Sequence, residues 1–230
     1  MVLEVIVLCA KHSEKDLWVK YCRESGREQD LIMVEPGGKY YFNFLEYESS
    51  HSVGGASLTE NIAQVLKTVI RASEERGGGK SDDPFWENSL DQAITAVIDL
   101  AKLAYGSVTV QRMYDIMTTA PKANEPKEET PRVGSYGHAF RMASNTNSKR
   151  YDEFIKKLIQ TSNTLPEEDE LDQMYLDATP DAVTLKAVDH FFIEQYRALS
   201  EKTRSIITMS FTGLLFRLMK EPVYSLFCQS

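Results

Sequence analysis

The stretch Asp83–Tyr105, DPFWENSLDQAITAVIDLAKLAY, has the clearest helical pattern in the chain. Its apolar residues recur every three or four positions, which predicts an amphipathic helix with one buried stripe. Asp83 suits the N-cap, Pro84 the first turn, and Gly106 the end of this helix. The predicted stripe consists of Trp86, Leu90, Ala93, Ile94, Val97, Ile98, Ala101 and Tyr105.

The segments on either side of this helix also have helical patterns. A preceding helix is predicted from Ser57, and later helices over Thr109–Thr118, Lys149–Thr161 and Ala182–Met219, the last as two helices or one kinked helix. The region near 121–148 is poor in aliphatic residues and contains three prolines, so it is predicted to be a long, mobile surface loop.

The N-terminal part has a different pattern. The run VLEVIVLCA at 2–10 is typical of a strand buried on both faces, a helix is predicted over Lys11–Ser25, and DLIMVEP at 30–36 indicates a second strand. The following segment, KYYFNFLEYE, is either a third strand or extended chain. We therefore predict a mostly α protein, with a helical bundle at 56–230 preceded by a short β-α-β stub within 1–55.

Composition narrows the class of protein. Of the 230 residues, 42% are hydrophobic and 26% are charged, which predicts a globular chain with a core. The net charge of −8 argues against a protein that coats nucleic acid, although it allows a local basic patch. The chain has an odd number of cysteines without CxxC spacing, which argues against a disulfide framework or a zinc site and favours a reducing cytoplasm. These cysteines are Cys9, Cys22 and Cys228. The N-terminal apolar run is too short for a membrane helix, so we expect a soluble chain.

Motifs for catalysis are weak. The segment Gly77–Ser81, GGGKS, looks like the end of a Walker A loop, but Glu74 stands where that loop needs a glycine, so we interpret it as a solvated linker. Asp99 follows an apolar run, as in a Walker B motif, but is interpreted as a helix-surface residue. The four histidines have no metal-ligand spacing. We predict no catalytic, cofactor-binding or metal-binding residues, and a nucleotide-binding enzyme that uses Lys80 is the weaker alternative.

One group of basic residues is a candidate for binding a partner. Such a group can hold a phosphate backbone or an acidic protein tail. The simpler alternative is a solvated helix face, balanced by the acidic run Glu167–Asp172, which could itself contact a basic partner. The candidate residues are Arg141, Lys149, Arg150, Lys156 and Lys157.

Four segments together resemble the coupling proteins of type IV secretion and conjugation systems, which are RecA-like hexameric motors. The first is VIVLCAKHSEKDLWVKYCRESGREQDLIMVEP at 5–36, followed by YYFNFLEYE, in which Asn43 and Phe44 match an F-N-x-L signature. The second is SLTENIAQVL at 57–66. The third, DPFWENSLDQAITAVIDLA at 83–101, contains an F-W-x-x-A/S start, and the fourth, at 191–215, contains LSEKTRS.

The resemblance implies part of a nucleotide-binding domain at 1–55 and an all-α substrate-recognition domain at 56–230. Walker A and Walker B would lie outside the chain, so this fragment is expected to be neither an enzyme nor a binder of the ATP and Mg²⁺ that the family uses. Implied partners are relaxosome, effector or adaptor proteins, with single-stranded DNA as a further candidate. The whole protein would be a hexamer at the cytoplasmic face of the inner membrane, and the fragment a monomer. The alternative is a stand-alone helical protein-interaction module.

Overall fold

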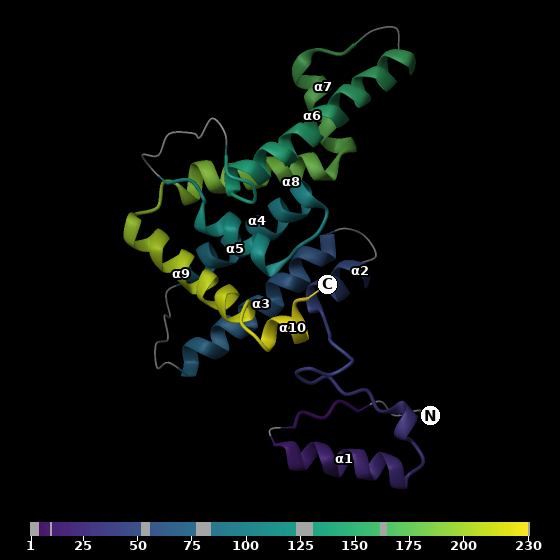
Figure 1. Ribbon diagram of the computed structural model, residues 1–230. Coiled ribbons are helices and arrows are strands. Elements are labelled where there is room, and N and C mark those ends of the chain that lie inside the picture. Colours follow the sequence, from purple (N-terminus) through teal and green to yellow (C-terminus); the bar gives the residue numbers. More distant parts are fainter. Residues whose placement is uncertain are drawn as a thin grey trace.

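The computed structural model describes residues 5–9, 11–51, 56–76, 84–122, 131–161 and 165–229. These residues are predominantly helical and contain no strand, so the mostly α prediction is confirmed (Figure 1). Besides a short 3₁₀ turn at Glu28–Asp30 and a π-helical segment, η2, at His190–Tyr196, the helices are α1 His12–Glu24, α2 Phe44–His51, α3 Ala56–Arg76, α4 Pro84–Tyr105, α5 Val110–Thr118, α6 Tyr136–Thr161, α7 Glu168–Ala178, α8 Pro180–Asp189, α9 Glu201–Leu218 and α10 Val223–Phe227.

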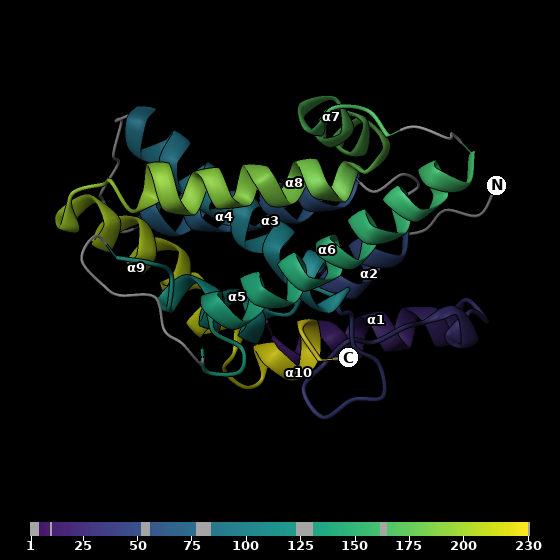
Figure 2. The same cartoon turned by 90° about the horizontal axis from the view of Figure 1, so that it is seen from above.

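Helix α4 is the centre of the bundle. It packs against α3, α5, α6, α8, α9 and η2, which surround it in the two perpendicular views (Figures 1 and 2). The apolar stripe predicted for this helix is confirmed except at Tyr105, which is half-buried, and the burial extends further around the helix to Ala96 and Leu100. A helix that is apolar over most of its circumference becomes stable when neighbours cover it on several sides.

Helix α4 ends and α5 begins where the sequence predicts, at Gly106 and Thr109. Gly106 has φ +69°, which glycine adopts without strain, and its N–H donates to the carbonyl of Lys102 at 2.8 Å. The Thr109 hydroxyl then caps α5 by accepting from the Arg112 N–H at 3.2 Å. No single helix in the described ranges has the length and apolar composition of a membrane span; α4 and α5 meet these criteria only as a pair bent by 112°.

The prediction of a loop near 121–148 is wrong from residue 136 onwards, because α6 begins there. Residues 123–130 lie outside the described part of the chain. The first turns of α6 bury Tyr136, Ala139 and Ala143 against the bundle. Two of these three contacts are made by alanines, which let α6 approach α4 closely. The first turns of α6 were not predicted because large aliphatic residues are the usual sign of a buried helix face. Small residues and one aromatic ring form this interface instead.

The segment after α7 confirms the two-helix alternative for Ala182–Met219. Helix α8 continues through η2, and the chain then turns into α9. The Ser200 hydroxyl caps α9 by accepting from the Thr203 N–H at 3.2 Å. The Arg204 guanidinium donates to the carbonyls of Arg197 and Leu199, both at 3.2 Å, so it holds the corner together.

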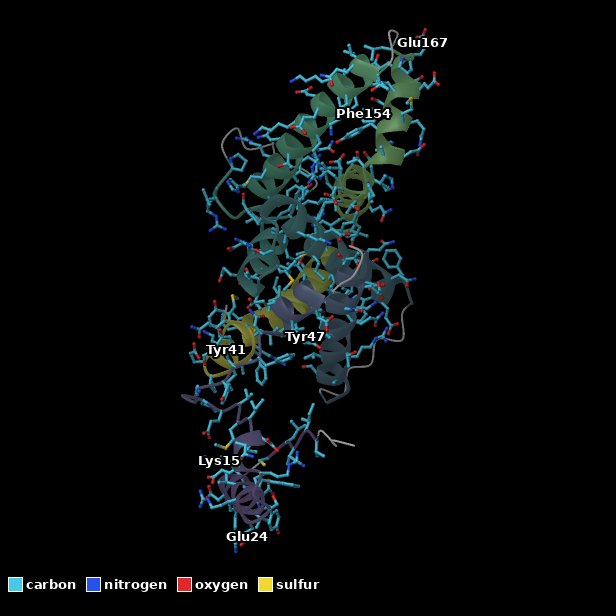
Figure 3. All side chains as sticks on the ribbon, turned by 90° about the vertical axis from the view of Figure 1, so that its right-hand side faces the viewer. Lys15, Glu24, Tyr41, Tyr47, Phe154 and Glu167 are labelled. Atoms are coloured by element: carbon cyan, nitrogen blue, oxygen red, sulfur yellow. The ribbon has the colours of Figure 1, made fainter. Side chains whose placement is uncertain are left out.

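The predicted β-α-β stub is not supported. Helix α1 is present where expected, but residues 5–9 form no strand, and the only pairing near the second predicted strand is an isolated bridge between Val34 and Tyr40. None of the described residues before Phe42 is buried, and Figure 3 shows Lys15 and Glu24 of α1 far from the bundle. A strand needs at least one neighbouring strand for its backbone hydrogen bonds, and none of the described segments supplies one.

The segment KYYFNFLEYE at 39–48, predicted as a third strand or extended chain, forms no strand, and its second half from Phe44 belongs to α2. The Asn43 carboxamide oxygen accepts from the backbone N–H groups of Leu45 and Glu46, at 3.1 and 3.2 Å, and thereby caps α2. Leu45 is fully buried, so α2 is fixed to the bundle immediately after its cap. Residues 5–42, which we call the N-terminal arm, therefore end where the bundle begins.

Replacing Ile94, which is fully buried in α4, with alanine should lower the free energy of unfolding by about 2–5 kcal/mol. The loss combines the missing transfer energy with the cavity left in the bundle core. Urea denaturation followed by circular dichroism measures it. The matched control is Ile159→Ala on α6, where the side chain is 52% exposed and the expected change is below about 1 kcal/mol. Equal losses for the two variants would contradict the central position of α4.

Candidate functional site

All five candidate basic residues lie on α6, but they do not form one compact patch. At about 100° per residue, Arg141, Lys149 and Lys156 share the outer face of the helix, and Arg150 and Lys157 lie on one flank. The rise of a helix places Arg141 and Lys156 about 22 Å apart along its axis. The predicted group is therefore a line of separated charges.

Neighbouring acidic residues also offset the positive charge of the basic residues on α6. Arg150 forms a salt bridge with Asp181 at the start of α8. Asp152 precedes Lys156 by four residues, and Glu153 follows Lys149 by four, which places opposite charges one turn apart. The exposed ammonium groups of Lys149, Lys156 and Lys157 are the part of the predicted group most accessible to a partner.

The acidic run belongs to α7, which packs beside the same part of α6. From Glu167 to Ala178 the chain carries six acidic residues and no basic residue. Glu168, Asp169 and Glu170 occupy the first turn, where the positive end of the helix dipole stabilises carboxylates. Figure 3 shows Glu167 at the end of the molecule opposite to α1. We call α7, the second half of α6 and the start of α8 the acidic tip.

A cleft of about 350 Å³ begins in the acidic tip and extends along α6 and α8 towards the bundle, as far as Phe140 and Asp189. Helices α6, α7 and α8 all contribute to its walls, and it is at the small end of the size range of ligand pockets. Its lining combines aromatic, aliphatic and charged side chains, namely Phe140, Asn147, Tyr151, Asp172, Tyr175, Leu176, Ala182, Leu185, Lys186 and Asp189.

Contacts among aromatic rings fix the wall between α6 and α7. The Tyr175 ring meets the Tyr151 ring edge-on at 4.9 Å between centroids, and the Phe154 ring at 5.5 Å. The Tyr175 hydroxyl donates to the Asn147 carboxamide oxygen at 2.8 Å. Tyr175 is buried, yet it lies outside the main core cluster, so the tip has a small apolar cluster of its own. The wall is thus held by the protein and does not need a ligand to form it.

Two carboxylates line the cleft. Asp172 accepts a hydrogen bond from the Tyr151 hydroxyl at 2.7 Å, and this bond raises the pKa of Tyr151. Asp189 is exposed, and within the described residues its carboxylate has no hydrogen bond or ion pair. Burial first and the Asp189 charge second raise the pKa of Tyr136, whose buried hydroxyl has no hydrogen-bond partner among the described groups. With Lys186 the lining carries a net charge of about −1.

Sequence reasoning missed this cleft. It predicted a helix over Lys149–Thr161 and treated Glu167–Asp172 as an acidic run that balances the basic helix face. The available signal was Tyr175, a large aromatic residue in the middle of an otherwise acidic helix. Nothing in the linear sequence indicates that Asp189, fourteen residues later, lines the same cleft.

The motifs weighed for catalysis have different outcomes. Gly77–Ser81, with Lys80, lies outside the described residues. Asp99 is on α4 as predicted, but it is not a free surface residue: it accepts a hydrogen bond from the Thr59 hydroxyl of α3 at 2.6 Å, and burial raises its pKa. Within the described ranges no group of three or more His, Cys, Asp or Glu residues is placed to hold a metal ion.

Comparisons of the chain with protein-family models, with curated proteins and with solved structures found no match.

The buried carboxylate of Asp99 gives a pH prediction. Its pKa is raised above 3.8 in the folded protein, so the favourable contribution of the protonated form is fully present below that pH and is lost as the pH rises through the raised pKa. Asp99→Asn, which keeps an acceptor for Thr59, should therefore gain stability relative to the original chain between pH 4 and 7. Urea unfolding of both proteins across this range measures the difference. A difference that does not change with pH would contradict the prediction.

Proposed function

We propose that the chain is the substrate-recognition part of a type IV coupling protein, which selects protein cargo while an ATPase core outside this chain drives its transfer. The observation that carries the recognition role is the cleft in the acidic tip. It is a concave site with aromatic walls and exposed carboxylates. Helix α7, which forms part of its wall, lies at the end of the molecule remote from α1 (Figures 1 and 3).

Three of the four segments on which the family resemblance depends pack together. SLTENIAQVL lies in α3, DPFWENSLDQ begins α4 and LSEKTRS begins α9, and these three helices contact one another. Their motif residues have structural roles: Trp86 is buried in the core, and Ser200 and Arg204 form the corner before α9. For these three segments the resemblance concerns one packed unit, which supports a shared domain architecture, whereas most of the first segment lies in the N-terminal arm.

The N-terminal arm supports a connection to a larger sheet. Val5, Ile6 and Leu8 are 73%, 91% and 92% exposed, in a run whose composition is that of a buried parallel strand. Leu17, Trp18 and Tyr21 of α1 are also 40–49% exposed. Apolar surface of this kind is typical of an interaction site. In the proposal, the rest of a RecA-like nucleotide-binding domain covers it, at the end of the bundle opposite to the cleft.

Protein cargo fits the tip better than DNA does. The basic residues of α6 are spread along the helix, and Arg150 is paired with Asp181. The cleft beside them carries carboxylates, which repel phosphate. A relaxosome protein, an effector or an adaptor is therefore the favoured partner, with the lysines of α6 in a supporting role.

A stand-alone interaction module is the second candidate, and the bundle core favours it. The core cluster runs from Leu45 to Cys228 and includes no described residue of the N-terminal arm. The two candidates differ in the coding sequence around the chain. The coupling-protein proposal requires an in-frame G-x-x-G-x-G-K-[ST] motif within some tens of residues upstream of Val2, and its absence would favour the stand-alone module.

Filling the cleft should block cargo transfer. Leu176→Trp places a large side chain in the lining and should reduce transfer at least tenfold, measured as cargo delivered per recipient cell, without lowering the amount of the protein. The matched control is Met174→Trp, on the same helix but outside the lining, which should leave transfer unchanged. Equal transfer by the two variants would contradict a recognition role for the cleft.

Direct DNA binding should be weak. If only Lys149, Lys156 and Lys157 contact a single strand, the logarithm of the binding constant should fall with the logarithm of salt concentration with a slope of about −2. Fluorescence anisotropy of a labelled oligonucleotide between 50 and 200 mM salt measures the slope. A slope steeper than about −4 would require more phosphate contacts and would favour DNA as the primary ligand.

A further inference from the structure

We propose that the cleft of the acidic tip binds the side chain of an arginine presented by a protein partner. This inference deepens the proposed function, because it names the chemical group by which cargo would be held. It depends on that function only for the identity of the partner, since the chemistry belongs to the cleft itself.

Charge selects a cation as the occupant. Asp172 on α7 and Asp189 on α8 both line the cleft, so two of its walls carry a carboxylate. The single basic residue of the lining, Lys186, is exposed, and its flexible stem lets the ammonium move into solvent. The surrounding helix α7 adds further acidic residues and no basic one. An anion or a phosphate backbone would be repelled here.

Shape and surface select arginine among cations. The guanidinium is planar, stacks on aromatic faces and donates to carboxylates from several N–H groups, whereas the lysine ammonium is a compact, strongly hydrated charge. Tyr151 and Phe140 are half-buried and supply aromatic surface, and the half-buried Leu176 supplies apolar surface for the methylene stem. The volume of about 350 Å³ suits one long side chain with its adjoining backbone.

The cleft is also prepared in advance for such a group. Tyr151 is held by Asp172 and Tyr175 by Asn147, so both rings keep their positions without a ligand. Asp172 uses one oxygen for Tyr151, which leaves the other oxygen for a guanidinium. Because these side chains need little reordering, the cost of binding is lower than for a mobile surface.

The test uses the full chain and three capped tripeptides, Gly-X-Gly, in which X is arginine, citrulline or leucine. Citrulline has nearly the shape of arginine but no charge. Titration at millimolar peptide, followed by backbone amide NMR shifts, should place the arginine peptide at α6, α7 and α8 around the cleft. We expect it to bind about five- to tenfold more tightly than the citrulline peptide, with the leucine peptide weaker still.

Two carboxylate variants connect this binding to the cleft. Asp172→Asn keeps an acceptor for the Tyr151 hydroxyl, and together with Asp189→Asn it should weaken the arginine peptide about tenfold or more. Asp177→Asn makes the same kind of charge change on α7 outside the lining, where Asp177 accepts from Gln173, and should change binding less than twofold. Unchanged amide spectra in the absence of peptide show that each variant folds.

Three results would overturn the inference: equal binding of the arginine and citrulline peptides, tighter binding of the leucine peptide, or equal weakening by the Asp177 control. The outcome is separate from that of the proposed function. Arginine binding at the cleft without any effect of Leu176→Trp on cargo transfer would leave this inference standing and remove the proposed role of the cleft in cargo selection. The reverse result would remove the inference alone.

Discussion

The burial of α4 on almost every side is the constraint on which the rest of the fold depends. Ala93, Ile94, Val97 and Ile98 are fully buried, and a helix with this much apolar surface is stable only inside a shell of neighbours. Helices α3, α5, α6, α8 and α9 form that shell. Because α6 and α8 both pack on α4, their separation is set by the core. The packing of α6 and α8 on α4 therefore sets the dimensions of the cleft between them, and α7 forms its third wall.

Within the acidic tip, the burial of apolar surface contributes more to stability than ion pairing does. The Arg150–Asp181 pair has side chains about half exposed, 47% and 51%, and such pairs contribute about 0–1 kcal/mol. Burying an aromatic side chain such as Tyr175 contributes about 1.5–3 kcal/mol, on the scale of large apolar residues. The tip is therefore held mainly by the rings of Tyr175, Tyr151 and Phe154. This arrangement leaves the charged groups of α7 available to a partner instead of committing them to structure.

The two ends of the molecule differ in the surface that they present. The N-terminal arm exposes aliphatic and aromatic side chains and is tied internally by ion pairs, such as that between Lys15 and Glu35 at 2.9 Å. The tip exposes carboxylates around an aromatic cleft. Apolar exposure is suited to permanent assembly with more protein, and a charged cleft is suited to reversible recognition. The proposed function assigns these two roles to a motor core and to cargo.

The sequence by itself determined the helices whose signals are local. The apolar spacing of α4, the hydroxyl cap of α5 at Thr109 and the glycine after α4 are each readable within one or two turns, because helix formation depends on neighbours in the chain. Prediction from the sequence failed where an element depends on a packing partner that is distant in the chain. The run at 5–9 has the composition of a strand, but strands form only beside other strands, and the early turns of α6 rely on alanines whose packing surface is α4. Only the tertiary structure placed Asp172 and Asp189 around one cleft, since the side chains that line it come from three helices whose approach the buried core decides.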